Sequence, residues 1–302
     1  MSDQYGRQVP ALPHPSPEDT EAWKAYWNTQ GQLWRTEPEI DTNRQEELTQ
    51  CRAIVPDIEK GRYPFKDMKL SRADVEWLLA THESGGIRGP VDWSDESQRE
   101  REGLDLRGAD LQQKDLSGLP LARIRGGIAT RERIAATEEQ ENIAGILLEG
   151  ANLAEAQLQR ACLLAANLSR ANLSGASLNR AELSRANLQF ANLERAKLGI
   201  ANLSEADLGL ANLHEAELNG AHMEGASLIM AHLEEADATN AHLERAILSG
   251  AHLQGAFLGR VFFDQGTYLT DVVLSNTALL ESVRWGGVDL SVANWTSVST
   301  PA

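Results

Sequence analysis

The sequence predicts a mainly β fold, a four-sided solenoid that follows a small helical N-terminal region. Two regularities carry this prediction. Every fifth residue from Ala151 to Ala256 is alanine, 22 in succession, and an apolar residue recurs in the same rhythm from Leu148 to Phe263, with leucine at 21 of these 24 positions. A period of five matches neither the helix, at about 3.6 residues per turn, nor the two-residue alternation of a strand. The chain therefore has to turn every five residues.

Four such turns close a square coil of about 20 residues, and successive coils stack at about 4.8 Å so that their backbones hydrogen-bond to one another. The leucines then fill the axis, the alanines lie inward where only a small side chain fits, and the other three residues of each repeat face solvent. We expect one column of this axis to consist of Leu153, Leu173, Leu193, Leu213, Leu233 and Leu253.

The repeated unit is Ala-(Asn or Asp)-Leu-x-x, as in Ala171-Asn172-Leu173-Ser174-Gly175. At this fidelity the sequence resembles the pentapeptide-repeat family over at least residues 146–263. The resemblance implies a right-handed quadrilateral β-helix.

Residues 1–100 lack the repeat and hold five of the seven tryptophans, which predicts a separate helical, Trp-rich region. Ser16 is expected to cap a helix that leads to Trp23, Tyr26 and Trp27, and this aromatic stripe is expected to seal the N-terminal end of the solenoid.

Two further helix starts are predicted in this region. Asp41 opens one helix, and Ser71 with Asp74 forms a capping box before another, which ends in a loop through Gly85 and Gly86.

The rest of the chain divides by how well the five-residue step is kept. Residues 101–121 form a first coil, 122–145 a projecting loop or short helix, 146–263 the regular β-helix, and 264–302 degenerate, bulged coils with a C-terminal cap. Trp285 and Trp295 are too large for a regular interior, so we expect them to close the open end and protect its unpaired edge; an interface role is the alternative.

Composition limits the partners. The formal charge of -16 and pI near 4.9 argue against direct binding of nucleic acid or an anionic membrane, both of which need excess Lys and Arg. A basic protein partner fits better.

Cys51 and Cys162 are the only cysteines, and with no signal peptide or long apolar stretch they favour a cytoplasmic location. The oligomeric state is left open, with an end-to-end dimer as one arrangement.

No phosphate-loop, nucleophile-elbow, zinc-protease or Cys-x-x-Cys motif occurs, so we expect no enzyme, no catalytic residue and no cofactor.

The histidines are the one group of residues that suggests a metal site. His222 and His242 are 20 residues apart, as are His232 and His252, so each pair stacks on one face. Asn occupies the same place elsewhere, and the His222 column offers no nearby second carboxylate, so a structural ladder is preferred and no metal is expected.

Charge is distributed unevenly along the repeats. Residues 146–200 carry four acids and six bases, net +2, whereas residues 201–245 carry nine acids against Arg245 alone, net -8. The sharper hypothesis is that the acidic half docks a basic partner, and the alternative is a merely solvated face. The predicted partner-binding residues are Glu205, Asp207, Glu215, Glu217, Glu224, Glu234, Glu235 and Asp237.

These observations favour a bacterial interaction scaffold, a protein-binding rod that holds its appendages at fixed separation. The alternative comes from resemblance: quinolone-resistance proteins of the Qnr type share the repeat and rod shape, and they mimic DNA to engage DNA gyrase, a type II topoisomerase.

Overall fold

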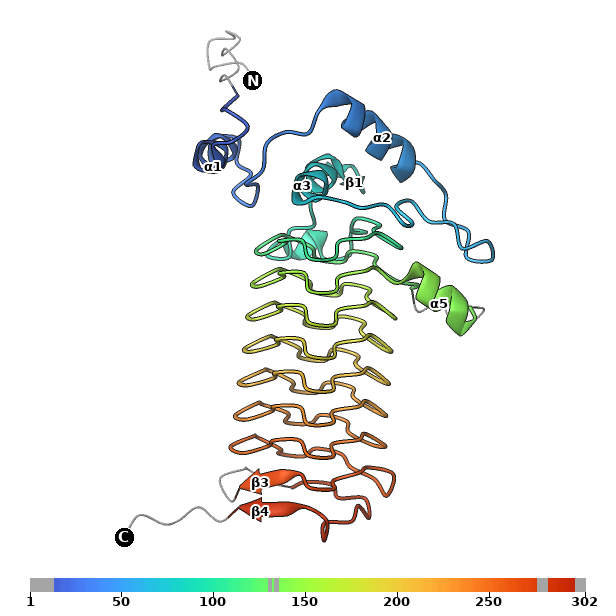
Figure 1. Cartoon of the computed structure of the whole chain (residues 1–302), viewed down its shortest axis with the longest axis vertical. Helices are drawn as coiled ribbons and strands as arrows, with labels where there is room; N and C mark the ends of the chain where they lie inside the picture. The colour runs from blue at the N-terminus through green and yellow to red at the C-terminus, as the bar shows by residue number, and fades with distance from the viewer. Residues whose placement is uncertain (1–13, 130–131, 133–135, 276–281, 297–302) are drawn as a thin grey trace.

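The computed structural model describes residues 14–129, 132, 136–275 and 282–296. Stacked coils form a rod with the N-terminal helices at one end and two short strands at the other (Figure 1). Parallel bridges join residues 20 apart through the regular section, for example Asn152 to Asn172 and Asn172 to Asn192. A coil of four pentapeptides is therefore the unit of the fold, and the solenoid is confirmed.

Backbone hydrogen bonds explain why the chain holds this shape. In the repeat 171–175, two N–H groups donate to the next coil, one to the preceding coil and one to the previous repeat, at 2.7 to 3.0 Å. The fifth N–H, that of Ser174, donates to the Oδ1 atom of Asn172 at 3.2 Å. All five donors of the repeat are thus satisfied, which is what burial of a tightly wound backbone requires.

Each repeat also contains one residue in the left-handed region, at the second position after the axial residue. Glu155, Arg170 and Phe190 adopt φ of 57°, 58° and 59° there, and Gly175 and Gly225 occupy the same position in other repeats. This conformation turns the chain at each of the four corners, and the repeat imposes it even on residues that normally avoid it.

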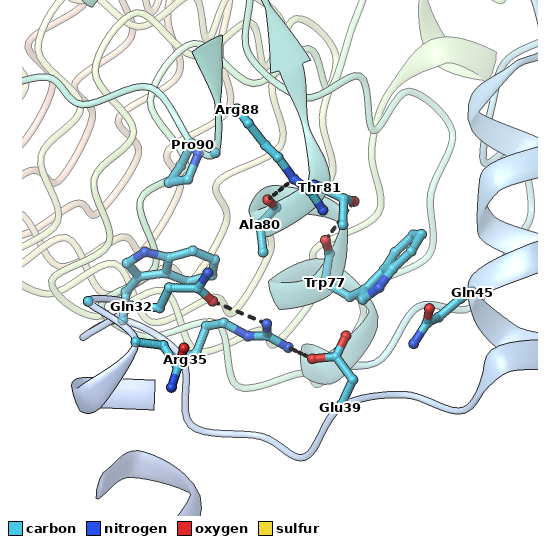
Figure 2. A pocket seen from close by; sticks show the side chains of 13 residues that line it. Gln32, Arg35, Glu39, Gln45, Trp77, Ala80, Thr81, Arg88 and Pro90 are labelled. Carbon is cyan, nitrogen blue, oxygen red and sulfur yellow. Dashed lines mark hydrogen bonds and ion pairs between the residues drawn. The ribbon is translucent and has the colours of Figure 1, made fainter. Parts of the chain in front are cut away.

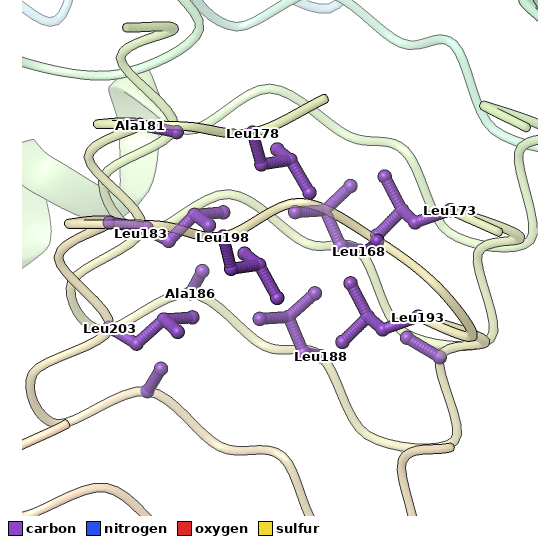
Figure 3. Close-up of a cluster of buried hydrophobic side chains, with 14 of the residues drawn as sticks. Leu168, Leu173, Leu178, Ala181, Leu183, Ala186, Leu188, Leu193, Leu198 and Leu203 are labelled. Carbon is purple, nitrogen blue, oxygen red and sulfur yellow. The ribbon is translucent and has the colours of Figure 1, made fainter. Parts of the chain in front are cut away.

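The interior consists of leucine and alanine alone over most of the rod. Leu168, Leu173, Leu178 and Leu183 are 0% exposed, and Figure 3 shows the leucines of successive coils packed against one another along the axis. The predicted axial residues Leu153, Leu173, Leu193, Leu213, Leu233 and Leu253 are all buried.

The N-terminal region contains the helices α1 (Thr20–Thr29), α2 (Thr42–Arg52) and α3 (Arg72–Thr81). Asp41 caps α2, and Ser71 with Asp74 forms the capping box of α3, so both predicted starts are confirmed. The predicted cap of α1 is wrong, because Asp19 rather than Ser16 accepts the free N–H of Ala22.

The seal at the N-terminal end of the coils is made by residues other than the aromatic stripe. Leu48 of α2 and Val75, Leu78 and Leu79 of α3 belong to one continuous core with the first axial leucine, Leu106. Trp23 and Trp27 are buried instead against each other, with ring centroids 5.6 Å apart.

After α3 the chain forms a hairpin of β1 (Glu83–Ser84) and β2 (Ile87–Arg88), which turns at Gly85 and Gly86, and then the 3-10 helix η1 (Glu96–Gln98). The first coil follows. Its ladder continues to Arg125, which is bridged to Asp105 and Cys162, so the coil extends into the segment predicted as a loop.

The helix α5 (Glu138–Ala144) lies in the insertion and protrudes from the side of the rod (Figure 1). Ala144 at its end is buried in a small cluster with Tyr63, Ile128 and Leu164, so the insertion is anchored at its base.

At the C-terminal end of the rod, β3 (Val273–Ser275) pairs in parallel with β4 (Asn294–Thr296). No helix within the described residues is long and apolar enough to span a bilayer.

Trp285 is half-buried against the core and stacks on the axial Phe263, with centroids 5.4 Å apart. Trp295 lies in β4 opposite Leu274. These places at the end of the coil suit a cap, and the capping role of both tryptophans stays a prediction.

Candidate interaction surface

Each repeat presents three outward side chains, one just before the axial residue and two at the corner after it. Because coils repeat every 20 residues, each position forms a column parallel to the rod. The surface is therefore a set of ladders, and its chemistry can be described column by column.

The most regular ladder is made of amides. Asn172 donates from Nδ2 to Asn152 Oδ1 at 3.0 Å, Asn192 donates to Asn172 at 3.2 Å, and Asn212 donates to Asn192 at 3.1 Å. Each Asn also accepts the N–H two residues later, as described for Ser174. This column binds neighbouring coils together, so its role is structural.

The histidines continue two ladders at the C-terminal coils. His222 and His242 stack with centroids 4.9 Å apart, and His232 and His252 lie 4.8 Å apart, so the predicted pairing by coil is confirmed. The expectation that no second carboxylate is near His222 is wrong. Glu224 and Glu244 both lie there, because the sequence spacing His-x-Glu returns an acid to the same face.

Some bases of residues 146–200, the basic half of the rod, pair with acids of the same chain. Arg160 pairs with Glu100, and Arg185 pairs with Glu138 and Glu141 of the insertion. The guanidinium of Arg170 lies 5.7 Å from the ring centre of Phe190. Arg160 and Arg185 therefore hold the N-terminal region and the insertion on the rod, whereas Arg170, Arg180 and Lys197 are exposed and show no ion pair among the described residues.

The predicted partner-binding acids fall into two groups. Asp207, Glu215, Glu224, Glu234 and Asp237 are partly buried and each bonds within the chain; Asp207, for example, accepts the N–H of Gly209 at 3.0 Å, and Glu215 pairs with Arg195 at 2.7 Å. The exposed group is Glu205, Glu217 and Glu235, for which the described part of the chain shows no ion pair.

A stripe of exposed apolar side chains runs along one corner in the same coils. Phe190, Leu210 and Met230 follow one another at 20-residue spacing and are 50%, 41% and 52% exposed. We call these three residues the apolar corner. A hollow of about 230 Å³ lies beside it, lined in part by Gly209 and Ile229. The sequence analysis missed this feature, although its signal is visible as three large apolar residues at 20-residue spacing, at a position that is polar or glycine in most other repeats.

The apolar corner has acidic neighbours beside Leu210 and Met230. Glu205 stands at the corner before Leu210, Glu215 and Glu235 stand at the corners after Leu210 and Met230, and Phe190 lies between the corners of Arg185 and Arg195. Protein interfaces commonly place apolar side chains at the centre and charged groups at the rim. The arrangement suits a partner with an apolar ridge between basic side chains.

The N-terminal region contains a second hollow, a polar cleft of about 700 Å³ beside α3 (Figure 2). Arg35 is the buried charge there, and its guanidinium donates to Gln32 at 3.2 Å and Glu39 at 3.0 Å while lying 3.5 Å from the ring centre of Trp27. Two carboxylates, Glu39 at 3.0 Å and Glu76 at 4.0 Å, already offset its charge, so the cleft gives no reason to expect an anionic ligand.

The thiols show no sign of activation. Burial raises the pKa of Cys162 to about 11, and its Sγ donates to the carbonyl oxygen of Ile128 at 3.2 Å. Burial also raises the pKa of Cys51. A raised pKa disfavours the thiolate, which is the nucleophilic form.

Comparison with known proteins agrees with this geometry. The family model for pentapeptide repeats matches residues 165–199, 201–228 and 226–265 with eight copies. The chain belongs to the pentapeptide-repeat family, whose members fold as right-handed quadrilateral β-helices.

Three solved structures illustrate the likeness. HetL, a pentapeptide-repeat protein involved in heterocyst differentiation regulation from the cyanobacterium Nostoc sp. strain PCC 7120, is 28% identical over 64% of this chain and 83% of its own, with a TM-score of 0.29. The protein alr5209 from Nostoc PCC 7120 is 30% identical over 40% and 84%, with a TM-score of 0.20. QnrB1, a plasmid-mediated fluoroquinolone resistance protein, is 15% identical over 64% and 84%, with a TM-score of 0.29. No curated protein matches the sequence.

Proposed function

We propose that this protein is a non-enzymatic interaction scaffold, a right-handed quadrilateral β-helix of the cytoplasm that binds a basic protein partner on the acidic half of its rod. The observation that carries the proposal is the apolar corner, where Leu210 and Met230 lie beside the acidic corners of Glu205, Glu215 and Glu235. Apolar side chains supply buried area, and the acids steer a basic partner and reject acidic ones.

The internal ion pairs of the basic half strengthen this choice of surface. Arg160 and Arg185 are engaged by acids of the same chain, whereas Glu205 and Glu235 are exposed. The surface open to a partner is thus more acidic than the net charge of the whole rod implies.

The test separates the apolar from the charged contribution. The partner is captured from source cells with the intact chain, and its affinity is then measured for two variants, Leu210→Ser with Met230→Ser and Glu205→Gln with Glu235→Gln. Loss of the apolar pair should weaken binding by about tenfold or more at every salt concentration. Loss of the acids should weaken it at low salt and little at high salt.

The matched control changes charge equally but elsewhere. Glu46 and Glu83 are exposed residues of the N-terminal region, and Glu46→Gln with Glu83→Gln alters the net charge by the same amount as the acidic-corner variant. An equal loss of affinity in this control, or unchanged affinity in both test variants, would remove the proposed surface.

DNA mimicry is the second candidate, and the net charge of -8 over residues 201–245 favours it. On this hypothesis the acidic half engages DNA gyrase or another type II topoisomerase. Purified protein should then alter gyrase supercoiling at about micromolar concentration, and shortening the insertion around α5 should weaken the effect. Absence of any effect on type II topoisomerases would exclude it.

A further inference from the structure

The amide ladder ends where two histidines replace asparagine. Asn152, Asn172, Asn192 and Asn212 are followed in the same column by His232 and His252. Asn at this position accepts the N–H two residues later, as Asn212 does for His214 at 3.1 Å. The Nδ1 atoms of His232 and His252 instead face the carboxylate of Glu234.

The three side chains converge on one point. Oε1 of Glu234 lies 3.2 Å from Nδ1 of His232 and 3.5 Å from Nδ1 of His252. Ligand atoms of the three residues all lie within 4.8 Å of one another. Zinc binds imidazole nitrogen and carboxylate oxygen at about 2.0 to 2.2 Å, so neighbouring ligands of a tetrahedral ion are about 3.3 to 3.6 Å apart. The two measured separations are already close to the edges of such a polyhedron.

The opposite face provides a comparison within the same coils. Glu224, His242 and Glu244 also lie within 4.8 Å of one another, but that group contains a single imidazole. His222 and His242 stack almost parallel, at 9°, and each contacts its own acid, Glu224 or Glu244. His232 and His252 are tilted by 32°, and both reach the single carboxylate of Glu234. The tilt directs two imidazoles toward one point, which parallel stacking does not.

A fourth group stands in the column of Glu234. Gln254 replaces the acid one coil further on, and its Oε1 atom is buried without a hydrogen-bond donor among the described residues. A buried acceptor without a partner is unfavourable. An ion, or water bound to it, would give this oxygen a partner.

We propose that His232, Glu234 and His252 form a binding site for a divalent transition metal, with zinc as the representative ion. Two imidazoles and one carboxylate suit zinc and its first-row neighbours better than magnesium or calcium, which prefer all-oxygen sites. Solvent or Gln254 completes the coordination. The ion joins two successive coils, because its histidines are 20 residues apart.

The rival explanation is a pair of hydrogen bonds from neutral imidazoles to Glu234, and a titration with zinc alone distinguishes the two. Chelator-treated full-length protein is titrated with zinc chloride by calorimetry and with cobalt chloride by visible absorption. We expect one site per chain that is lost, or weakened by at least about tenfold, in His232→Asn and in His252→Asn. Glu234→Gln should behave in the same way.

His222→Asn is the matched control, since it removes an imidazole from the opposite face and its column already carries Asn202. Its affinity for zinc should stay within about twofold of the wild type. Asparagine is the residue that the repeat itself uses, so the variants should fold, and their unfolding midpoints confirm it. Absence of saturable zinc binding, or an equal loss in His222→Asn, would overturn the proposal.

Discussion

Replacing one asparagine of the amide ladder tests how the coil satisfies its backbone. In Asn172→Ala three hydrogen bonds are lost: the one from Ser174 N–H at 3.2 Å, the one from Asn192 Nδ2 at 3.2 Å, and the one to Asn152 Oδ1 at 3.0 Å. A net value of about 0.5 to 1.5 kcal/mol for each bond sums to about 1.5 to 4.5 kcal/mol, and since the side chain is half-buried we take the lower-middle part of this range, a loss of about 2 to 3 kcal/mol.

The loss of stability should be seen locally as well as in global unfolding, because each coil of a solenoid contacts mainly its neighbouring coils. Hydrogen exchange on the native protein should show the Ser174 amide exchanging about 30- to 150-fold faster, which is the same free energy expressed as a rate. Ser174→Ala is the control, since it leaves the backbone N–H and its acceptor in place, and its cost should stay below about 0.5 kcal/mol. Unchanged exchange at residue 174 in Asn172→Ala would refute the reasoning.

Three further outcomes follow from particular contacts. Gly127→Ala should cost about 3 kcal/mol or more, because a Cβ atom there would lie 2.4 Å from a backbone oxygen, whereas Gly175→Ala should cost only about 1 kcal/mol for its positive φ; equal melting temperatures would contradict this. Burial favours a higher pKa for Asp74, but hydrogen bonds from Arg44 and from the helix cap hold it below its ordinary value. The ionised Asp74 therefore stabilises the fold fully above about pH 4, and this stabilisation is lost as the pH falls through the lowered pKa of the folded state. Asp74→Asn should flatten the acid side of a plot of unfolding free energy against pH. An unchanged acid side would exclude the pairing of Asp74 with Arg44. Cys162, whose pKa is raised to about 11, should react with iodoacetamide at pH 8 much more slowly in the folded than in the unfolded protein. Equally fast labelling of both, read by mass spectrometry, would show that the fold does not hold this thiol protonated.

The interior of the rod follows directly from the sequence, since the five-residue rhythm determines which side chains point inward. The spacing and size of Leu173 and the other axial leucines were enough to predict that they lie in the interior. Helix starts at Asp41 and Ser71 were equally visible, because capping depends on residues three positions apart. These features are local in the chain, and local patterns predict them.

The surface was harder to predict because its contacts join distant segments. The pairing of Arg160 with Glu100 spans 60 residues, and that of Arg185 with Glu141 spans 44, so charge counting alone assigned the basic half too much free charge. The convergence of His232 and His252 on Glu234 depends on a tilt between two rings, which no spacing reveals. The left-handed corner also escaped notice, since arginine and glutamate occupy it as readily as glycine.

The account depends most on the stacking of residues 20 apart, and spin labels measure this directly. Lys197 and Glu217 are bridged neighbours on one face, whereas Asp207 lies ten residues from each, on the opposite face of the square. In a chain whose two native cysteines are replaced, nitroxide labels at residues 197 and 217 should report adjacent backbones, about 4.8 Å apart, through strong dipolar broadening. Labels at residues 197 and 207 should show much weaker coupling. Stronger coupling for the pair ten residues apart would contradict the stacked four-sided coil.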